Sequence, residues 1–81
     1  MYFVYVLKSE KDNYLYIGIT NNLNKRLKQH NDGSNFSTKH RRPFKLVYFE
    51  IKENRQKARE REKFLKSGCG REYIKKLIKQ Y

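Results

Sequence analysis

Hydrophobic residues in the first quarter of the chain fall into two short runs that are typical of β-strands. Residues Tyr2–Leu7 form an unbroken apolar run, too short for a helix, which predicts a central strand covered on both faces. Residues Tyr14–Thr20 are mostly aromatic or β-branched and predict a second strand. The polar segment between them ends in Asp12-Asn13, a turn signal, so the two runs should pair as an antiparallel hairpin.

The segment after the second run has helical spacing. Leucines recur four residues apart behind Asn21 and Asn22, which can cap a helix over residues 23–30 that ends before Gly33. Arg26 and His30 are also four residues apart. Both side chains should therefore project from one face of this helix.

The second half of the chain predicts one more strand and two more helices. Phe44–Lys52 is the third strand, with Pro43 at its start, where the missing amide donor does least harm. Asn54 can cap a helix over Arg55–Ser67, closed by the glycines of Gly68–Gly70. A third, amphipathic helix should pack back on the sheet through side chains at helical spacing. They are Tyr73, Ile74, Leu77, Ile78 and Tyr81.

Length and pattern together predict one small α+β domain over residues 1–81. Its sheet has three antiparallel strands flanked by helices in the order β-β-α-β-α-α, about the most that 81 residues can build. The single cysteine, Cys69, excludes an internal disulfide and argues against a cysteine-based zinc site. The N-terminus lacks the features of a signal peptide, so we expect a cytoplasmic protein.

The charge balance points to a polyanionic partner. Twenty Lys and Arg against eight Asp and Glu give a formal net charge of +12. Nucleic acid is the first candidate. A membrane is not expected as a partner, because there is no long basic amphipathic helix and no run near the roughly 20 apolar residues of a spanning helix.

The segment from Ser34 to Pro43 shows no periodicity and is rich in cations. Lys39, Arg41 and Arg42 lie in it, beside the helix that carries Arg26 and His30. Such a loop can clamp phosphates. It can equally be an ordinary solvated loop, and the sequence gives both interpretations about equal weight.

Glu62 is the most informative residue of the second helix. At about 100° per residue it shares a stripe with Ala58 and Leu65, whereas Glu60 points to the opposite side. An inward carboxylate needs a partner, because burying it alone is costly. Two partners are open: Lys66, one turn further along, or a divalent cation, which hard carboxylate oxygens suit.

Six residues of the chain have an order and spacing that resemble the GIY-YIG nuclease domain. The second half of the family motif is intact as Tyr16-Ile17-Gly18, whereas Phe3-Val4-Tyr5 stands where Gly-Ile-Tyr would be and keeps only the tyrosine. The resemblance covers essentially the whole chain and is closest to small standalone bacterial proteins similar to the N-terminal domain of the C subunit of excinuclease ABC. The six are Tyr5, Tyr16, Gly18, Arg26, His30 and Glu62.

The resemblance implies a metal-dependent endonuclease that hydrolyses phosphodiester bonds of DNA. Glu62 would hold one divalent metal ion, magnesium or alternatively manganese, against the phosphate. Arg26 would stabilise charge on the pentacovalent transition state. Cleavage in repair or recombination of structured DNA is the pathway class that the resemblance suggests.

The same resemblance assigns the remaining roles around the attacking water. Tyr5, assisted by His30, would orient or deprotonate the water, which requires nearby cations to lower the tyrosine pKa from about 10. Tyr16 would complete the hydrogen-bond network. Gly18, without a side chain, would let backbone or phosphate approach closely.

DNA is the expected partner, and RNA stays open. Its contacts would come from Lys39, Arg41, Arg42 and Lys66, and a partner protein could supply targeting, while the sequence does not specify the oligomeric state. The alternative is a nucleic-acid-binding module without catalytic activity of its own, which needs only the charge. A protein–protein adaptor, which would not need a net charge of +12, ranks last.

Overall fold

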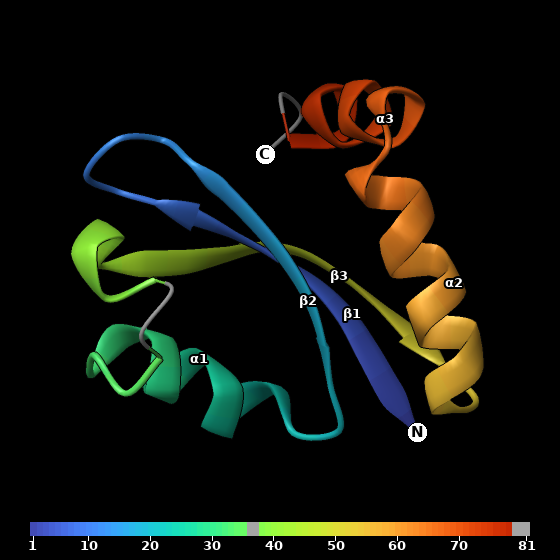
Figure 1. Ribbon diagram of the computed structural model, residues 1–81, viewed down its shortest axis with the longest axis horizontal. Coiled ribbons are helices and arrows are strands. Elements are labelled where there is room, and N and C mark those ends of the chain that lie inside the picture. The colour runs from blue at the N-terminus through green and yellow to red at the C-terminus, as the bar shows by residue number, and fades with distance from the viewer. Residues whose placement is uncertain (36–37, 79–81) are drawn as a thin grey trace.

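The computed structural model describes residues 1–35 and 38–78, which form a three-stranded antiparallel sheet with helices on both faces (Figure 1). The strand order is β2-β1-β3, so the apolar first strand is central, as its sequence predicts. The strands are β1 (Tyr2–Ser9), β2 (Leu15–Thr20) and β3 (Phe44–Lys52).

The helices confirm the predicted fold class and the order β-β-α-β-α-α. Helix α1 covers one face of the sheet, and α2 and α3 cover the other (Figure 1). A short 3-10 helix before β3 adds to the predicted elements. The bounds are α1 (Leu23–Asn31), the 3-10 helix η1 (Lys39–Arg41), α2 (Arg55–Lys66) and α3 (Gly68–Ile78).

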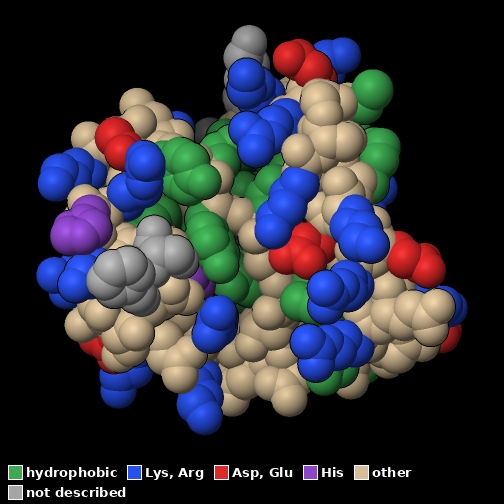
Figure 2. Space-filling view, in the orientation of Figure 1, with side chains coloured by type: hydrophobic (Ala, Val, Ile, Leu, Met, Phe, Trp, Pro, Cys, Tyr) green, Lys and Arg blue, Asp and Glu red, His purple; other side chains and the backbone are tan. Residues whose placement is uncertain are grey.

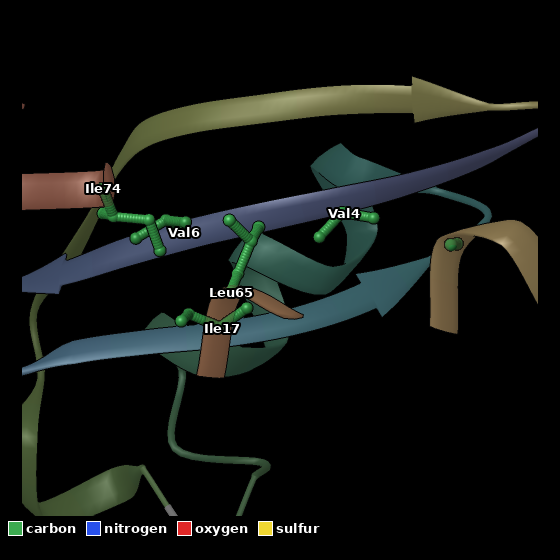
Figure 3. Close-up of a cluster of buried hydrophobic side chains, with 6 residues drawn as sticks. Val4, Val6, Ile17, Leu65 and Ile74 are labelled. Atoms are coloured by element: carbon green, nitrogen blue, oxygen red, sulfur yellow. The ribbon is translucent and has the colours of Figure 1, made fainter. Parts of the chain in front are cut away.

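Strand β1 is buried from both sides because its side chains alternate between two hydrophobic clusters. Val6 belongs to the cluster under α2 and α3, together with Leu65 and Ile74 (Figure 3). Tyr5 and Leu7 point the other way, into the cluster under α1. This two-sided burial explains the continuous apolar run and fixes Tyr5 on the α1 face.

Asparagine caps start the first two helices, as predicted. The Asn22 side chain accepts a hydrogen bond from the Lys25 amide at 3.1 Å. Asn54 does the same for the Lys57 amide at 2.9 Å. Each cap satisfies an amide that the helix leaves free, a contribution of about 1 kcal/mol.

The glycines of Gly68–Gly70 start a helix rather than forming a break between two helices. Helix α2 ends at Lys66, Ser67 caps it, and α3 begins at Gly68. Gly70 is buried at the point where the two helices meet, and a Cβ there would lie 1.9 Å from the Phe64 carbonyl oxygen. The glycine is therefore required by the close helix contact.

Helix α3 packs back on the sheet through its apolar side, as expected. Ile74 is fully buried, and Ile78 packs against the same cluster, whereas Tyr73 remains 40% exposed. Tyr81 lies outside the described residues. Among residues 1–35 and 38–78, the structure contains no helix with the length and apolar character needed to cross a membrane.

Candidate active site

Tyr5 and Gly18 face each other across the sheet and form the floor of the site. They are direct partners in the β1–β2 register, and Tyr5 is 1% exposed. A Cβ on Gly18 would lie 2.5 Å from the Tyr5 hydroxyl oxygen and 2.7 Å from its ring carbon Cζ. In the structure, the close approach at Gly18 is made by the Tyr5 side chain, and the approach of a phosphate stays a prediction.

Helix α1 brings Arg26 and His30 to the Tyr5 hydroxyl, so these three predicted residues meet. Their i,i+4 spacing places both on the face of α1 that packs on the sheet. His30 Nε2 lies 3.1 Å from the hydroxyl oxygen, and Arg26 donates to that oxygen through Nε at 3.4 Å. Tyr16 lies alongside, with its ring centroid 4.8 Å from that of His30.

Thr38 completes the chain of hydrogen bonds on the buried side of His30. The imidazole is fully buried, and its Nδ1 lies 2.8 Å from Thr38 Oγ1. The threonine hydroxyl donates to the Asn35 carbonyl oxygen at 3.4 Å, so it can accept from Nδ1–H. This leaves Nε2 as the acceptor for the Tyr5 hydroxyl proton, an assignment inferred from the network.

Burial shifts the pKa values of both titrating groups of this network, His30 and Tyr5. It lowers the pKa of His30 to about 4, with the charge of Arg26 acting in the same direction, so the ring is neutral at neutral pH. Burial also raises the pKa of Tyr5 above its usual value, although Arg26 opposes this. The expectation that nearby cations lower the Tyr5 pKa is therefore wrong for the free protein, because desolvation of the phenolate outweighs them.

One side of α2 forms the opposite wall of the site. Four residues at i, i+4, i+7 and i+11 spacing line a cleft of about 350 Å³ that Tyr5, Tyr16, Gly18 and Arg26 also line. Three of the four are cationic, and the fourth is the single carboxylate of this wall. They are Arg55, Arg59, Glu62 and Lys66.

The position of Glu62 is compatible with both partners expected from the sequence, Lys66 and a divalent cation. Ala58 and Leu65 are buried as predicted, and Glu62 lies beside them with its side chain 19% exposed and lining the cleft. Its Oε2 also pairs with Lys66 Nζ at 3.1 Å. Because the Lys66 side chain is 51% exposed, this pair is of the kind that contributes 0 to about 1 kcal/mol and can open.

The donor set fits a metal ion shared with substrate rather than one enclosed by protein. Within residues 1–35 and 38–78, no three His, Cys, Asp or Glu side chains cluster as metal ligands. Magnesium is commonly held by one or two carboxylates, with waters and substrate phosphates filling its other positions. Glu62 can supply that carboxylate, and the surrounding arginines favour a phosphate beside it.

The predicted loop cations lie elsewhere. Arg41 pairs with Asp12 at 2.7 Å and lies over the Tyr14 ring, 4.1 Å from its centroid. Arg42 donates to the Lys39 carbonyl oxygen at 2.9 Å. None of these three cations lines the cleft of Glu62, and their contact with DNA stays a prediction. Part of this loop, residues 36–37, lies outside the described structure.

Sequence reasoning missed three residues of the site. Arg55 and Arg59 had a usable signal, because they continue the helical stripe of Glu62 toward the N-terminus of α2. Thr38 had none, since a lone hydroxyl in an irregular loop belongs to no periodic pattern.

Comparison with known proteins identifies the family. The family model described as the GIY-YIG catalytic domain matches residues 1–76. The chain belongs to the GIY-YIG family. This membership places it in a superfamily of nucleases and implies binding to nucleic acid.

Its relatives in the GIY-YIG family include several UPF0213 proteins. One from Clostridium perfringens is 52% identical over 82% of this chain and 71% of its own length. The UPF0213 protein YazA of Bacillus subtilis is 44% identical over 80% of this chain and 66% of its own length. The solution NMR structure of a UPF0213 protein from Bacillus halodurans has a TM-score of 0.57 and 30% identity, covering 95% of this chain and 85% of that one.

Proposed function

We propose that this GIY-YIG protein is a metal-dependent endonuclease that hydrolyses phosphodiester bonds of DNA. The observation that carries the proposal is the meeting of two parts of the chain in one cleft. Tyr5 and Arg26 line the cleft from β1 and α1, with His30 hydrogen-bonded behind Tyr5, and the Glu62 carboxylate lines the same cleft from α2. A protein that only binds nucleic acid needs the charge but not this set.

Arg26 serves as the charge clamp of the proposed reaction. Its Nε holds the Tyr5 hydroxyl, and its Nη1 donates to Gln29 Oε1 at 3.3 Å, so the guanidinium is fixed at the mouth of the cleft. A positioned donor of this kind stabilises charge that develops on the phosphorane and is worth about 10²–10³ in rate. The guanidinium stays charged, since its hydrogen bond to Tyr5 raises its pKa further.

Tyr5 orients the attacking water, with His30 as the acceptor behind it. The tyrosine hydroxyl points its proton at His30 Nε2, which leaves an oxygen lone pair for a water proton. When water attacks phosphorus, its proton passes to the Tyr5 oxygen and the original Tyr5 proton passes to His30. The P–O bond to the leaving oxygen breaks, and this oxygen departs as an alkoxide that takes a proton from solvent. Burial is the larger cause of the low His30 pKa and the charge of Arg26 the smaller one; a phosphate in the cleft offsets the part that Arg26 contributes.

Glu62 is the residue that would hold the divalent metal ion, magnesium or manganese. Bound there, the ion would supply Lewis-acid stabilisation of the phosphate. Lys66, released from Glu62, would then be free to contact phosphate. Action on structured DNA in repair or recombination, with a partner protein for targeting, is the setting that we propose for this activity.

A matched pair of variants tests the proposal. Glu62→Gln removes the carboxylate charge of the cleft, whereas Glu60→Gln removes the same charge from an exposed position on the opposite side of α2. Both are incubated with labelled single-stranded, duplex, flap and branched DNA, with and without magnesium or manganese. We expect metal-dependent cleavage that survives Glu60→Gln and is lost in Glu62→Gln. Cleavage by both variants would refute the ligand role of Glu62, and binding without any cleavage would favour a binding module.

A further inference from the structure

A second cleft opens between the edge of β2 and helix α3. Its volume is about 350 Å³, and its walls combine tyrosine rings with the ends of long cationic side chains. The tyrosines and cations that line it are Tyr14, Tyr16, Lys66, Arg71 and Lys75.

The second cleft continues the first one. Tyr16 and Lys66 line both, so a single trench follows the outer edge of β2 from Gly18 toward Asn13. Its lining residues on this edge run from Asn13 to Ile19, and at about 3.3 Å per residue this gives a length of roughly 20 Å. Figure 2 shows this hollow in the middle of the molecule, with hydrophobic side chains along its floor.

Cations follow the helix side of the trench from end to end. Figure 2 shows Lys and Arg side chains on the α2 and α3 side of the hollow, with acidic side chains in the minority. Glu62 is the single carboxylate lining the two clefts. The cations are Arg55, Arg59, Lys66, Arg71 and Lys75.

Tyr14 gives the far end of the trench an aromatic wall with a cation on one side. The ring is 44% exposed, Arg41 lies over it at 4.1 Å from the centroid, and Asp12 holds Arg41 by an ion pair at 2.7 Å. Aromatic rings beside a cationic track are the arrangement by which proteins bind single nucleic-acid strands. A cleft of about 350 Å³ has the size of one small ligand, not of a base-paired duplex.

We propose that the cleft between β2 and α3 is a subsite for unpaired nucleotides of DNA that flank the phosphodiester held beside Gly18 and Glu62. Arg71 and Lys75 contact the phosphates of this flank, and the Tyr14 ring stacks on a base. The substrate class would then be DNA with a single-stranded segment next to the cleavage point. This inference rests on the proposed function for the position of the scissile bond.

The first test removes two charges from the cleft and two from elsewhere. The cleft variant is Arg71→Gln/Lys75→Gln, and the control is Lys45→Gln/Lys57→Gln, whose residues are exposed on β3 and on α2 and line neither cleft. Fluorescence anisotropy measures binding to a labelled single strand of roughly 12 nucleotides and to its duplex, with no divalent metal. We expect the cleft variant to bind the single strand with at least tenfold lower affinity than the control. The slope of log affinity against log salt concentration should be smaller in magnitude by roughly 1.4, because two phosphate contacts are lost.

The second test addresses the aromatic wall. Tyr14→Ala should weaken single-strand binding by roughly five- to 150-fold, the range seen when one stacking ring is removed. Tyr73→Ala is the matched control, since Tyr73 is similarly exposed at 40% and lines neither cleft. The affinity of each cleft variant for the duplex should differ from that of its control by less than twofold.

The outcomes separate this inference from the proposed function. Two results would overturn the proposed subsite. One is an equal loss of single-strand affinity in the cleft and control variants, and the other is a loss of duplex affinity as large as the loss of single-strand affinity. Because binding is measured without metal, the subsite stands if the variants behave as expected even when no DNA is cleaved. Cleavage that depends on Glu62 but not on a single-stranded flank would refute the subsite and leave the nuclease intact.

Discussion

Arg26 bonds Tyr5 and Gln29 through its guanidinium and belongs to neither hydrophobic cluster, so its removal costs hydrogen bonds but leaves the apolar packing in place. We expect Arg26→Ala to lower kcat for DNA cleavage by about 10²–10³, because the transition state loses a positioned donor. Affinity for DNA should change far less, since many other cations remain. Lys25→Ala, at the exposed neighbouring position, is the control and should cleave normally. Near-normal turnover by Arg26→Ala would contradict the assignment.

The buried His30 should make stability depend on pH. Its pKa is about 4 in the fold, whereas an unperturbed histidine titrates near 6.5. Between these values the unfolded chain binds the additional proton, so the free energy of unfolding should fall as pH drops from 6.5 to 4, by up to roughly 3 kcal/mol. Urea unfolding across this range measures the loss, and His30→Gln should flatten it. An NMR titration that places the His30 midpoint near 6.5 would refute the assignment.

At the residue scale, the sequence predicted the placement of side chains better than their pKa values. Spacing was enough to place Arg26 and His30 on one helix face and Glu62 on the inner side of another. The direction of the Tyr5 pKa was not predictable from the number of cations, because it depends on how deeply the ring is buried. Thr38 was invisible for a related reason: its role comes entirely from a contact eight residues away in an irregular segment.

The junction of α2 and α3 offers a test at the scale of elements. A Cβ on Gly70 would lie 1.9 Å from the Phe64 carbonyl oxygen, whereas one on Gly68 would meet nothing within 4 Å. We expect Gly70→Ala to destabilise the protein by about 1–3 kcal/mol or more, as overpacking does. Gly68→Ala should be neutral or slightly stabilising, because it reduces the freedom of the unfolded chain. Urea unfolding measures the free energy of unfolding of both variants. Equal values would contradict the close contact, because α2 and α3 could then move apart at no cost.

Elements were predictable where apolar spacing or a capping side chain marks them. Both asparagine caps and all three strands are confirmed, because a buried strand and a capped helix each leave a local signature. The glycines of Gly68–Gly70 predicted a break instead, since the sequence does not reveal that one helix starts immediately where another stops. That the inner side of α2 lines the same cleft as Tyr5 and Arg26 depends on tertiary packing, which the sequence does not reveal.

On the scale of the whole molecule, a net charge of +12 should make salt act in two opposite directions. Salt screens repulsion among the cations of the free protein, so its Tm should rise by a few degrees from low to high sodium chloride. The same increase should weaken DNA binding, because the release of counterions from the phosphates gains less free energy at high salt. Arg71→Gln/Lys75→Gln, with less charge, should show the smaller change in Tm. A Tm that falls with salt would mean that attractive ion pairs dominate the folded state.

Gly18 has a consequence for how this sequence can evolve. The space above its Cα is filled by the ring and hydroxyl of Tyr5, so the two positions are not free to mutate independently. A lineage that exchanges the tyrosine for a smaller residue gains the freedom to replace the glycine, whereas alanine beside an intact tyrosine should be strongly selected against. Natural variation at these two positions should therefore be correlated, and a side chain in place of Gly18 should mark relatives that no longer have the tyrosine hydroxyl.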